Sequence, residues 1–292
     1  MSSHRSRIQQ RWVDLDAQAH VNNARVLDYL QEARVDWLLS GPHAGLLGRA
    51  VVVVEHQVSY LAGMDIAAGF VEVDLSLGHV GASRFALGYE VRQRQQVAAV
   101  AATQMCYVSP ETGRAAPMPP DTRAWFAAQS GELEPLPDLG SWVVGAAAHE
   151  HSLRVRWSDI DAYGHVNNVT YYDYVAEARI ALTAAVMPDS IVADVDSRSA
   201  HRWLVARQDI RYVREVRHRR EPYLVRTAFF GVGRTSVRLV AEIVDPVSGV
   251  VFARTRTVLV HADATGAPSP VPDSLRSAVE RWPAIPRDRG RP

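Results

Sequence analysis

The sequence predicts an α+β protein with two tandem domains, each built from one long helix and an antiparallel sheet. One 24-residue segment occurs twice, as RWVDLDAQAHVNNARVLDYLQEAR at 11–34 and as RWSDIDAYGHVNNVTYYDYVAEAR at 156–179, with 14 of 24 positions identical. Apolar residues follow the shared motif at helical spacing, and four runs rich in Val, Tyr and Phe follow each helix. The repeat spacing of 145 residues is about half the chain, which indicates a duplicated domain and not a solenoid.

The boundary between the domains is predicted in a stretch rich in proline and glycine, GELEPLPDLG at 131–140. We therefore expect a first domain at 1–130, a linker at 131–148 and a second domain at 149–292.

Each half is predicted to begin with a short strand that ends near Trp12 or Trp157, whose side chains we expect in the core. A polar loop carries the motif, and a helix follows it. Asn22–Asn23 and Asn167–Asn168 suit the N-cap of that helix, because asparagine accepts hydrogen bonds from the first helical amides. The predicted strands lie at 51–61, 70–78, 84–94 and 97–108, and at 203–214, 222–231, 235–245 and 250–260.

Composition and charge argue against a nucleic-acid-binding protein. Apolar residues make up 47% and charged residues 22% of the 292 residues, and all 32 basic residues are arginine. Residues 1–145 carry 11 Arg against 15 acidic residues (net −4), and residues 146–292 carry 21 against 17 (net +4). Such a dipolar chain argues against general nucleic-acid binding, which requires a concentrated basic face.

The same features predict a cytoplasmic protein without a membrane span. The opening MSSHRSRIQQRW has no apolar core of a secretory signal, and the aliphatic run at 51–54 is far too short to cross a bilayer. The single cysteine, Cys106, lies in an apolar strand-like run and is interpreted as a packing residue. The histidines are scattered without metal-ligand spacing, so we expect no metal and no other cofactor.

The repeated loop, D-x-D-x-x-x-H-V-N-N, brings together the groups that acyl transfer requires. The first amides of a helix are unpaired and carry partial positive charge, so they polarise a carbonyl and stabilise an oxyanion. An aspartate beside them attacks the carbon or deprotonates water. The alternative is that Asp14, Asp159 and the asparagines only cap and turn the chain.

The loop resembles that of the hotdog-fold thioesterases, both the 4-hydroxybenzoyl-CoA thioesterase-like group and the plant acyl-ACP thioesterases. The resemblance implies two tandem hotdog domains that form a pseudo-dimer within one chain, and it leaves a homodimer of such chains open. It implies an acyl-CoA or an acyl carrier protein as the substrate, in fatty acid metabolism.

The resemblance also implies roles for individual residues. The catalytic aspartate falls on Asp16 and Asp161, and the histidine of the acyl-ACP type falls on His20 and His165. The amide that polarises the thioester carbonyl is expected near Asn23 and Asn168.

Departures from the family pattern favour the second half as the working site. In the acyl-ACP type, an asparagine stands two residues before the histidine. This position holds Gln18 in the first half and Tyr163 in the second, and Tyr163 is assigned to substrate binding. The glycine before the histidine is kept as Gly164, also assigned to substrate binding, and is Ala19 in the first half. Some relatives carry a catalytic glutamate three residues after a strand tyrosine, which falls on Glu215 after Tyr212 and on Gly63 after Tyr60.

The densest basic stretch, RYVREVRHRR at 211–220, has no basic counterpart in the first half. One interpretation is a solvated strand end. The other is a clamp for the phosphates of CoA or for an acidic carrier protein, since guanidinium groups match phosphate geometry. Arg217 and Arg219 are the predicted ligands, and an unbroken strand puts them on one face with Arg211, opposite Arg214 and Arg220.

Three functions follow from these features. The first is hydrolysis of an acyl thioester, with Asp161 and Asp16 as base or nucleophile. The second is non-catalytic binding or sensing of an acyl thioester on the same fold. The third, a hotdog dehydratase, fits less well because those enzymes place the histidine and the acid differently.

Overall fold

The structure is a computed structural model that describes residues 3–16, 20–48, 50–187, 201–263 and 265–287. It divides into two compact units, Met1–Pro137 and Asp138–Pro292. This division falls inside the stretch expected to be a linker; the domain limits drawn from the sequence remain predictions.

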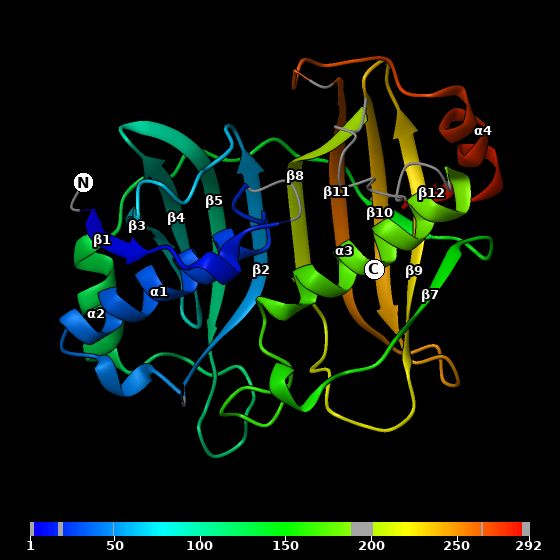
Figure 1. Cartoon of the computed structure of the whole chain (residues 1–292). Coiled ribbons are helices and arrows are strands. Elements are labelled where there is room, and N and C mark those ends of the chain that lie inside the picture. Colours follow the sequence, from blue (N-terminus) through cyan, green and yellow to red (C-terminus); the bar gives the residue numbers. More distant parts are fainter. Residues whose placement is uncertain (1–2, 17–19, 49, 188–200, 264, 288–292) are drawn as a thin grey trace. The chain divides into compact units, whose positions relative to one another are not determined.

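The first unit contains a five-stranded antiparallel sheet (Figure 1). Hydrogen-bonded neighbours follow the order β1-β3-β4-β5-β2. Its strands are β1 (His4–Gln9), β2 (Val51–Tyr60), β3 (Phe70–Val80), β4 (Arg84–Gln93) and β5 (Gln96–Tyr107).

The second unit repeats this topology strand for strand, in the order β7-β9-β10-β11-β8. The eight strands predicted after the helices are all present, with ends shifted by at most three residues. The strands of this unit are β7 (His149–Leu153), β8 (His201–Tyr212), β9 (Tyr223–Val232), β10 (Ser236–Val244) and β11 (Val251–Asp263). A small second sheet pairs β6 (Trp142–Val144) with β12 (Ala284–Pro286).

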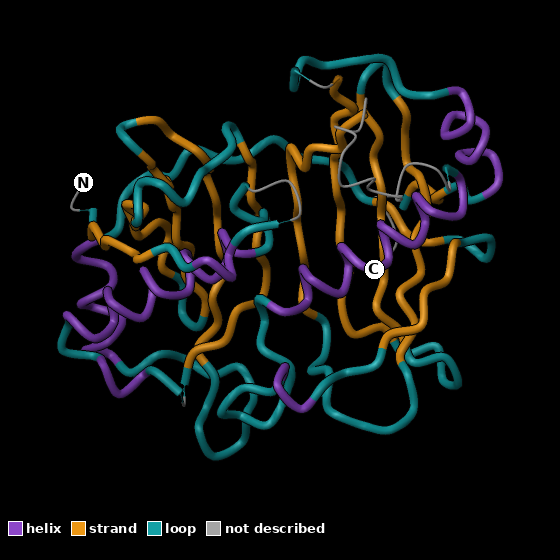
Figure 2. The backbone as a smooth tube through the Cα atoms, viewed as in Figure 1, coloured by secondary structure: helices purple, strands orange, loops and turns teal. Residues whose placement is uncertain are grey.

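One long helix packs on the sheet of each unit: α1 (Arg25–Ser40) on β1 and β3, and α3 (Thr170–Val186) on β7 and β9 (Figures 1 and 2). Apolar side chains at helical spacing form the buried face, which confirms the predicted helices. In α1 the buried apolar residues are Val26, Leu27, Tyr29, Leu30, Ala33, Trp37 and Leu38. Opposite them, alternate residues of β3 are buried, as a sheet with one covered face requires.

The starts of these helices correct the predicted N-caps. The N-cap residues are Ala24 and Val169, without a side-chain cap. The side chains of Asn22 and Asn167 instead accept from the amides of those two residues, at 3.0 and 3.3 Å. The asparagines therefore shape the turn that leads into each helix.

Two shorter helices, α2 (Pro120–Gln129) and α4 (Asp273–Arg281), were not predicted. Phe126 of α2 is fully buried, and its ring lies 4.7 Å from that of Phe85 and 5.3 Å from that of Trp37. Leu275 and Ala278 of α4 belong to the apolar core of the second unit. Each helix therefore closes the core of its own unit.

The prediction that Trp12 and Trp157 lie in the core is wrong. Their exposed fractions are 79% and 77%. Strands β1 and β7 end three or more residues earlier, and each tryptophan begins a 3-10 turn, η1 (Trp12–Asp14) or η3 (Trp157–Asp159). Cys106 is buried in β5, as predicted.

No helix in the described part of the chain is long and apolar enough to cross a membrane. Among the same residues, no group of three or more His, Cys, Asp or Glu side chains is arranged to hold a metal ion.

Phe126→Ala is expected to destabilise the chain by about 3–5 kcal/mol, because it removes a fully buried ring and leaves a cavity beneath α2. Denaturant unfolding measures the loss. Arg123→Ala, an exposed change in the same helix, is the control and is expected to cost less than about 0.5 kcal/mol. Equal stability of the two variants would contradict a core role for α2.

Candidate active site

The first aspartate of each motif, Asp14 or Asp159, holds the loop against the long helix. The carboxylate of Asp159 accepts from the amide of Arg156 at 2.8 Å and from the hydroxyl of Tyr174 at 2.6 Å. Asp14 makes the equivalent bonds at 2.8 Å each. Burial, together with the bonded carboxylate, raises the pKa of the Tyr174 hydroxyl. These contacts favour the structural interpretation for the first aspartate of the pair.

The second aspartate stands on a tight two-stranded loop in the second unit. The amide of Asp161 donates to the carbonyl of His165 at 2.9 Å, and the amide of Gly164 donates to the carbonyl of Asp161 at 3.0 Å. Gly164 has φ +81°, a left-handed conformation that favours glycine. The side-chain Oδ1 of Asp161 accepts from the amide of Tyr163 at 2.9 Å.

This loop places Asp161 and His165 side by side. The Oδ2 of Asp161 lies 3.4 Å from the Nδ1 of His165, and both side chains are 21% exposed. The Tyr163 ring stacks on the imidazole with a centroid distance of 5.5 Å and an interplanar angle of 5°. The predicted residues Tyr163 and Gly164 therefore shape the loop and restrain its histidine.

Glu215 reaches the same imidazole from the segment that follows β8. The amides of Val213 and Arg214 both donate to the carbonyl of Phe252, at 2.8 and 3.0 Å, so a bulge turns the chain out of the sheet. The carbonyl of Val216 then accepts from the amide of Val166, beside His165, at 2.9 Å.

The imidazole therefore lies between two carboxylates. The Oε1 of Glu215 lies 3.7 Å from the Nε2 of His165, opposite the Asp161 contact at Nδ1. Side-chain contacts of this length tighten in many enzymes when substrate binds. The three groups have the composition of a general acid–base site.

The first unit builds the same backbone frame around different side chains. Val21 donates to the carbonyl of Met64 at 2.9 Å, as Val166 does to Val216, so Gly63 occupies the place of Glu215. The amide of Asp16 donates to the carbonyl of His20 at 2.8 Å, and His20 is exposed. Gln18 and Ala19 lie outside the described residues. This loop therefore keeps its aspartate and histidine, and the position of the glutamate holds a glycine.

The second asparagine of each motif lies at the start of the long helix. The carbonyl of Asn168 accepts from the hydroxyl of Tyr212 at 2.7 Å, and that of Asn23 accepts from Tyr60 at 3.0 Å. The helix entry is therefore tied to the strand that leads to the glutamate position, which brings the first helical turn to the same edge of the unit as the loop.

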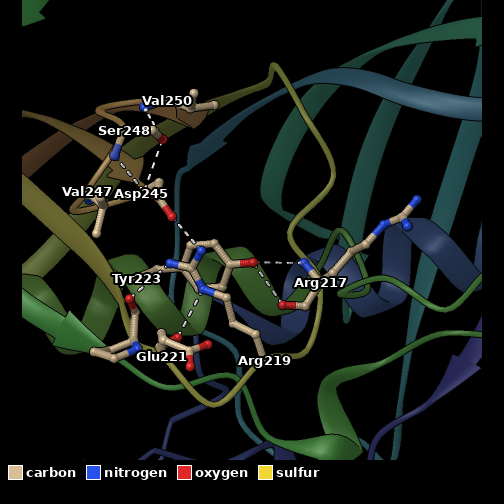
Figure 3. A network of polar contacts seen from close by, with 9 residues as sticks. Arg217, Arg219, Glu221, Tyr223, Asp245, Val247, Ser248 and Val250 are labelled. Atoms are coloured by element: carbon tan, nitrogen blue, oxygen red, sulfur yellow. Dashed lines mark hydrogen bonds and ion pairs between the residues drawn. The ribbon is translucent and has the colours of Figure 1, made fainter.

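The basic stretch does not continue as a strand, which corrects the assumed alternation of its arginines. β8 ends at Tyr212, and residues 213–222 form a loop. The hydroxyl of Tyr223 fastens this loop, accepting from the amide of Arg217 at 3.3 Å and donating to its carbonyl at 2.9 Å (Figure 3).

Arg219 is fully engaged within this loop. Its guanidinium donates to the carbonyls of Glu221 and Pro222 at 3.0 Å each, pairs with Asp245 and lies 3.8 Å above the Tyr223 ring (Figure 3). The pKa of Asp245 is lowered, first by bonds from the Ser248 backbone and then by Arg219. These contacts favour the structural interpretation for Arg219. The Arg217 side chain points away from this network, and its Nη2 lies 2.9 Å from the Oε2 of Glu215.

A family model described as the Thioesterase-like superfamily matches residues 10–126 and 155–279, which include both repeats. The chain belongs to this superfamily. Its class of activity is thioester hydrolysis, as the sequence predicts. No match was found among curated proteins.

Several solved structures share the fold over most of their length. A protein described as an oleoyl thioesterase from Lactobacillus plantarum matches with a TM-score of 0.70 at 16% identity, over 89% of this chain and 96% of that one. The 12:0-ACP thioesterase from Umbellularia californica gives a TM-score of 0.64 at 19% identity, over 88% and 93%. An acyl-ACP thioesterase from Bacteroides thetaiotaomicron gives 0.63 at 12%, over 89% and 100%. The superfamily and these likenesses confirm the predicted fold of two tandem hotdog domains.

Gly164→Ala is expected to lower stability by about 1–2 kcal/mol, because alanine is strained at positive φ. It is also expected to lower kcat about tenfold, because the turn sets the distance between Asp161 and His165. Thermal unfolding and steady-state kinetics measure the two effects.

The matched control is Gly266→Ala. Gly266 has φ +88° in a turn that contains none of the site residues, and both glycines have open space around the added Cβ. The control is expected to lose similar stability with unchanged kcat. A matching loss of kcat in both variants would refute the role assigned to the loop.

Proposed function

We propose that this superfamily member hydrolyses an acyl thioester at the loop of the second unit, with Asp161, His165 and Glu215 as its catalytic residues. The observation that carries the proposal is the imidazole of His165, which has a carboxylate beside each of its nitrogens. Hydrolysis needs groups that take a proton from water and return one to the leaving sulfur, and this set provides them.

The proposed reaction follows from these groups. Overall, water and the thioester give an acid and a thiol: the carbon–sulfur bond breaks, and the sulfur leaves as a thiol after taking a proton. Asp161 either attacks the carbon, giving an anhydride that water opens, or deprotonates the attacking water. The backbone amide of Asn168, at the positive end of α3, is assigned to stabilise the oxyanion. Label on the Asp161 carboxylate after a single turnover in ¹⁸O-water would establish nucleophilic attack, with water opening the anhydride at the aspartate carbon.

The loop of the first unit has the weaker claim to catalysis. Asp16 and His20 keep the motif, but Gly63 provides no carboxylate where the second unit has Glu215. We therefore assign turnover to Asp161 and His165, and Asn23 belongs to the less complete of the two loops.

Asp161→Asn is expected to lower kcat on the order of 10²-fold or more, because it removes the base or nucleophile without changing side-chain size. Asp16→Asn, the matched change in the first unit, is expected to have a smaller effect. The measurement is release of free thiol from a panel of acyl-CoA substrates. A larger loss in Asp16→Asn would reverse the ranking of the loops.

The same panel separates the enzyme from its alternatives. A binding or sensing protein would retain acyl-CoA without freeing thiol, and a dehydratase would change enoyl absorbance without freeing thiol. If neither aspartate variant slows thiol release, the proposed catalytic residues are wrong.

The substrate is proposed to be an acyl group on CoA or on a carrier protein. The names of two structural neighbours, a 12:0-ACP thioesterase and an acyl-ACP thioesterase, support this class. The arginines of the 211–220 stretch support it as well, because both carriers are anionic. Arg211, Arg214 and Arg220 are exposed, whereas Arg219 is committed to Asp245.

Replacing both Arg214 and Arg220 by glutamine is expected to raise KM for an acyl-CoA several-fold and leave kcat unchanged, because carrier phosphates bind far from the thioester. Salt is expected to raise the KM of the unaltered protein, since it screens attraction between exposed charges. The screening (Debye) length is about 10 Å at 0.1 M ionic strength. The control substrate is a short acyl-pantetheine, which lacks the nucleotide. Equal effects on both substrates would mean that these arginines are structural.

A further inference from the structure

Glu215 is held by two residues that have no counterpart in the first unit. Tyr171 of α3 bonds the backbone beside it: the tyrosine hydroxyl accepts from the amide of Val216 at 3.0 Å. Arg217 bonds the carboxylate itself, with its Nη2 2.9 Å from Oε2.

The backbone contact fixes where the glutamate starts. Val216 is fully buried, its carbonyl is bonded to Val166, and its amide is bonded to Tyr171. Tyr171 is itself buried and packs edge-on against the ring of Tyr212 at 5.1 Å. On the other side of Glu215, the bulge at Val213 is bonded to the carbonyl of Phe252. The Cα of Glu215 therefore lies between two segments whose backbone is fixed by hydrogen bonds.

The side-chain contact fixes where the carboxylate points. Arg217 binds Oε2, and the other oxygen, Oε1, faces the Nε2 of His165 at 3.7 Å. Side-chain exposures of 72% for Arg217 and 54% for Glu215 mean that this pair contributes little to stability. Its effect is to restrict the orientation of Glu215.

The first unit shows that the fold does not require either residue. Val26 stands where α3 has Tyr171, and Asp65 stands two residues beyond Gly63, where Arg217 follows Glu215. The backbone bond from Val21 to Met64 nevertheless forms at 2.9 Å, as its equivalent does in the second unit. The tyrosine and the arginine occur in the half of the chain that carries the glutamate.

We propose that Tyr171 and Arg217 are positioning residues that aim Glu215 at His165. For Arg217 this is a different role from the phosphate contact that the sequence predicts. The inference rests on the proposed function, because it assigns how one of its catalytic residues is held.

Double-mutant cycles test the proposal. Tyr171→Phe and Arg217→Gln are each made in the native chain and in Glu215→Gln, and kcat and KM are measured with one acyl-CoA. In the native chain Tyr171→Phe is expected to lower kcat about tenfold and Arg217→Gln about fourfold, each with little change in KM, because a displaced catalytic group slows the chemical step and an exposed ion pair restrains it weakly. In the Glu215→Gln background the same changes are expected to lower kcat less than about twofold, because their target is gone.

The control is Tyr174→Phe, which removes a tyrosine hydroxyl from the same helix. Tyr174 bonds Asp159 and not the segment that carries Glu215. Its effect on kcat is therefore expected to be the same factor in both backgrounds.

Three results would overturn the inference. These are unchanged kcat in both positioning variants, equal losses of kcat with and without Glu215, and an Arg217→Gln effect confined to KM for acyl-CoA and absent for acyl-pantetheine. The last result would make Arg217 a phosphate ligand. Arg217 is exposed, so its cycle remains measurable if Tyr171→Phe does not fold.

Failure of the function gives a different pattern. If the native chain frees no thiol from any acyl-CoA, the proposed function is wrong, and if Asp161→Asn and Glu215→Gln both turn over like the native chain, the proposed catalytic residues are wrong. If both lose activity and the cycles are additive, only the positioning role is wrong.

Discussion

The site of this protein depends on one backbone hydrogen bond, from the amide of Val166 to the carbonyl of Val216. The bond joins the motif loop before α3 to the segment that follows β8, and these segments lie 50 residues apart in the sequence. A buried backbone group must be paired, so the bond is favoured whatever side chains surround it. It brings a histidine on one segment beside a glutamate on the other.

The duplicated half separates this frame from the chemistry it carries. Val21 and Met64 form the same bond, and the same bulge turns Leu61 and Ala62 out of β2 toward a single carbonyl, that of Ala98. Because the backbone frame is set by hydrogen bonds, it persists when the glutamate becomes Gly63. Side chains are free to diverge on such a frame, so a repeated motif in a sequence establishes a repeated geometry and not a repeated activity.

Elements with strong periodicity were predictable from the sequence, and those defined by a few side chains were not. The long helices and the strands after them appear because each buries a continuous apolar face, as in α1 and β3. Helices α2 and α4 are short, and their one clear signal is a proline followed by an aspartate, at Pro119–Asp121 and Pro272–Asp273. The hairpin turn at Arg94–Gln95 was predicted from the strands on its two sides, although both of its residues adopt positive φ without glycine or asparagine.

The candidate site was predictable as a set of residues but not as a set of contacts. The resemblance to the hotdog thioesterases implied Asp161, His165 and Glu215, and the structure brings these three side chains together. Charge density alone could not separate Arg217 from Arg219, since that distinction depends on where the chain leaves β8 and which acceptors it then meets. One feature of the sequence could have indicated Tyr171: the equivalent residue in the half without the glutamate is Val26.

The contacts of His165 also explain why a second carboxylate matters in such a site. A neutral imidazole donates a hydrogen bond from only one of its nitrogens, whereas the charged ring donates from both. Asp161 lies 3.4 Å from Nδ1 and Glu215 lies 3.7 Å from Nε2, so a carboxylate stands beside each nitrogen of the ring. In the proposed reaction, this imidazole is the group that passes a proton from water to the leaving sulfur. With Gly63 in place of the glutamate, the first unit provides no carboxylate at this position, which is the physical basis for treating the two loops as unequal.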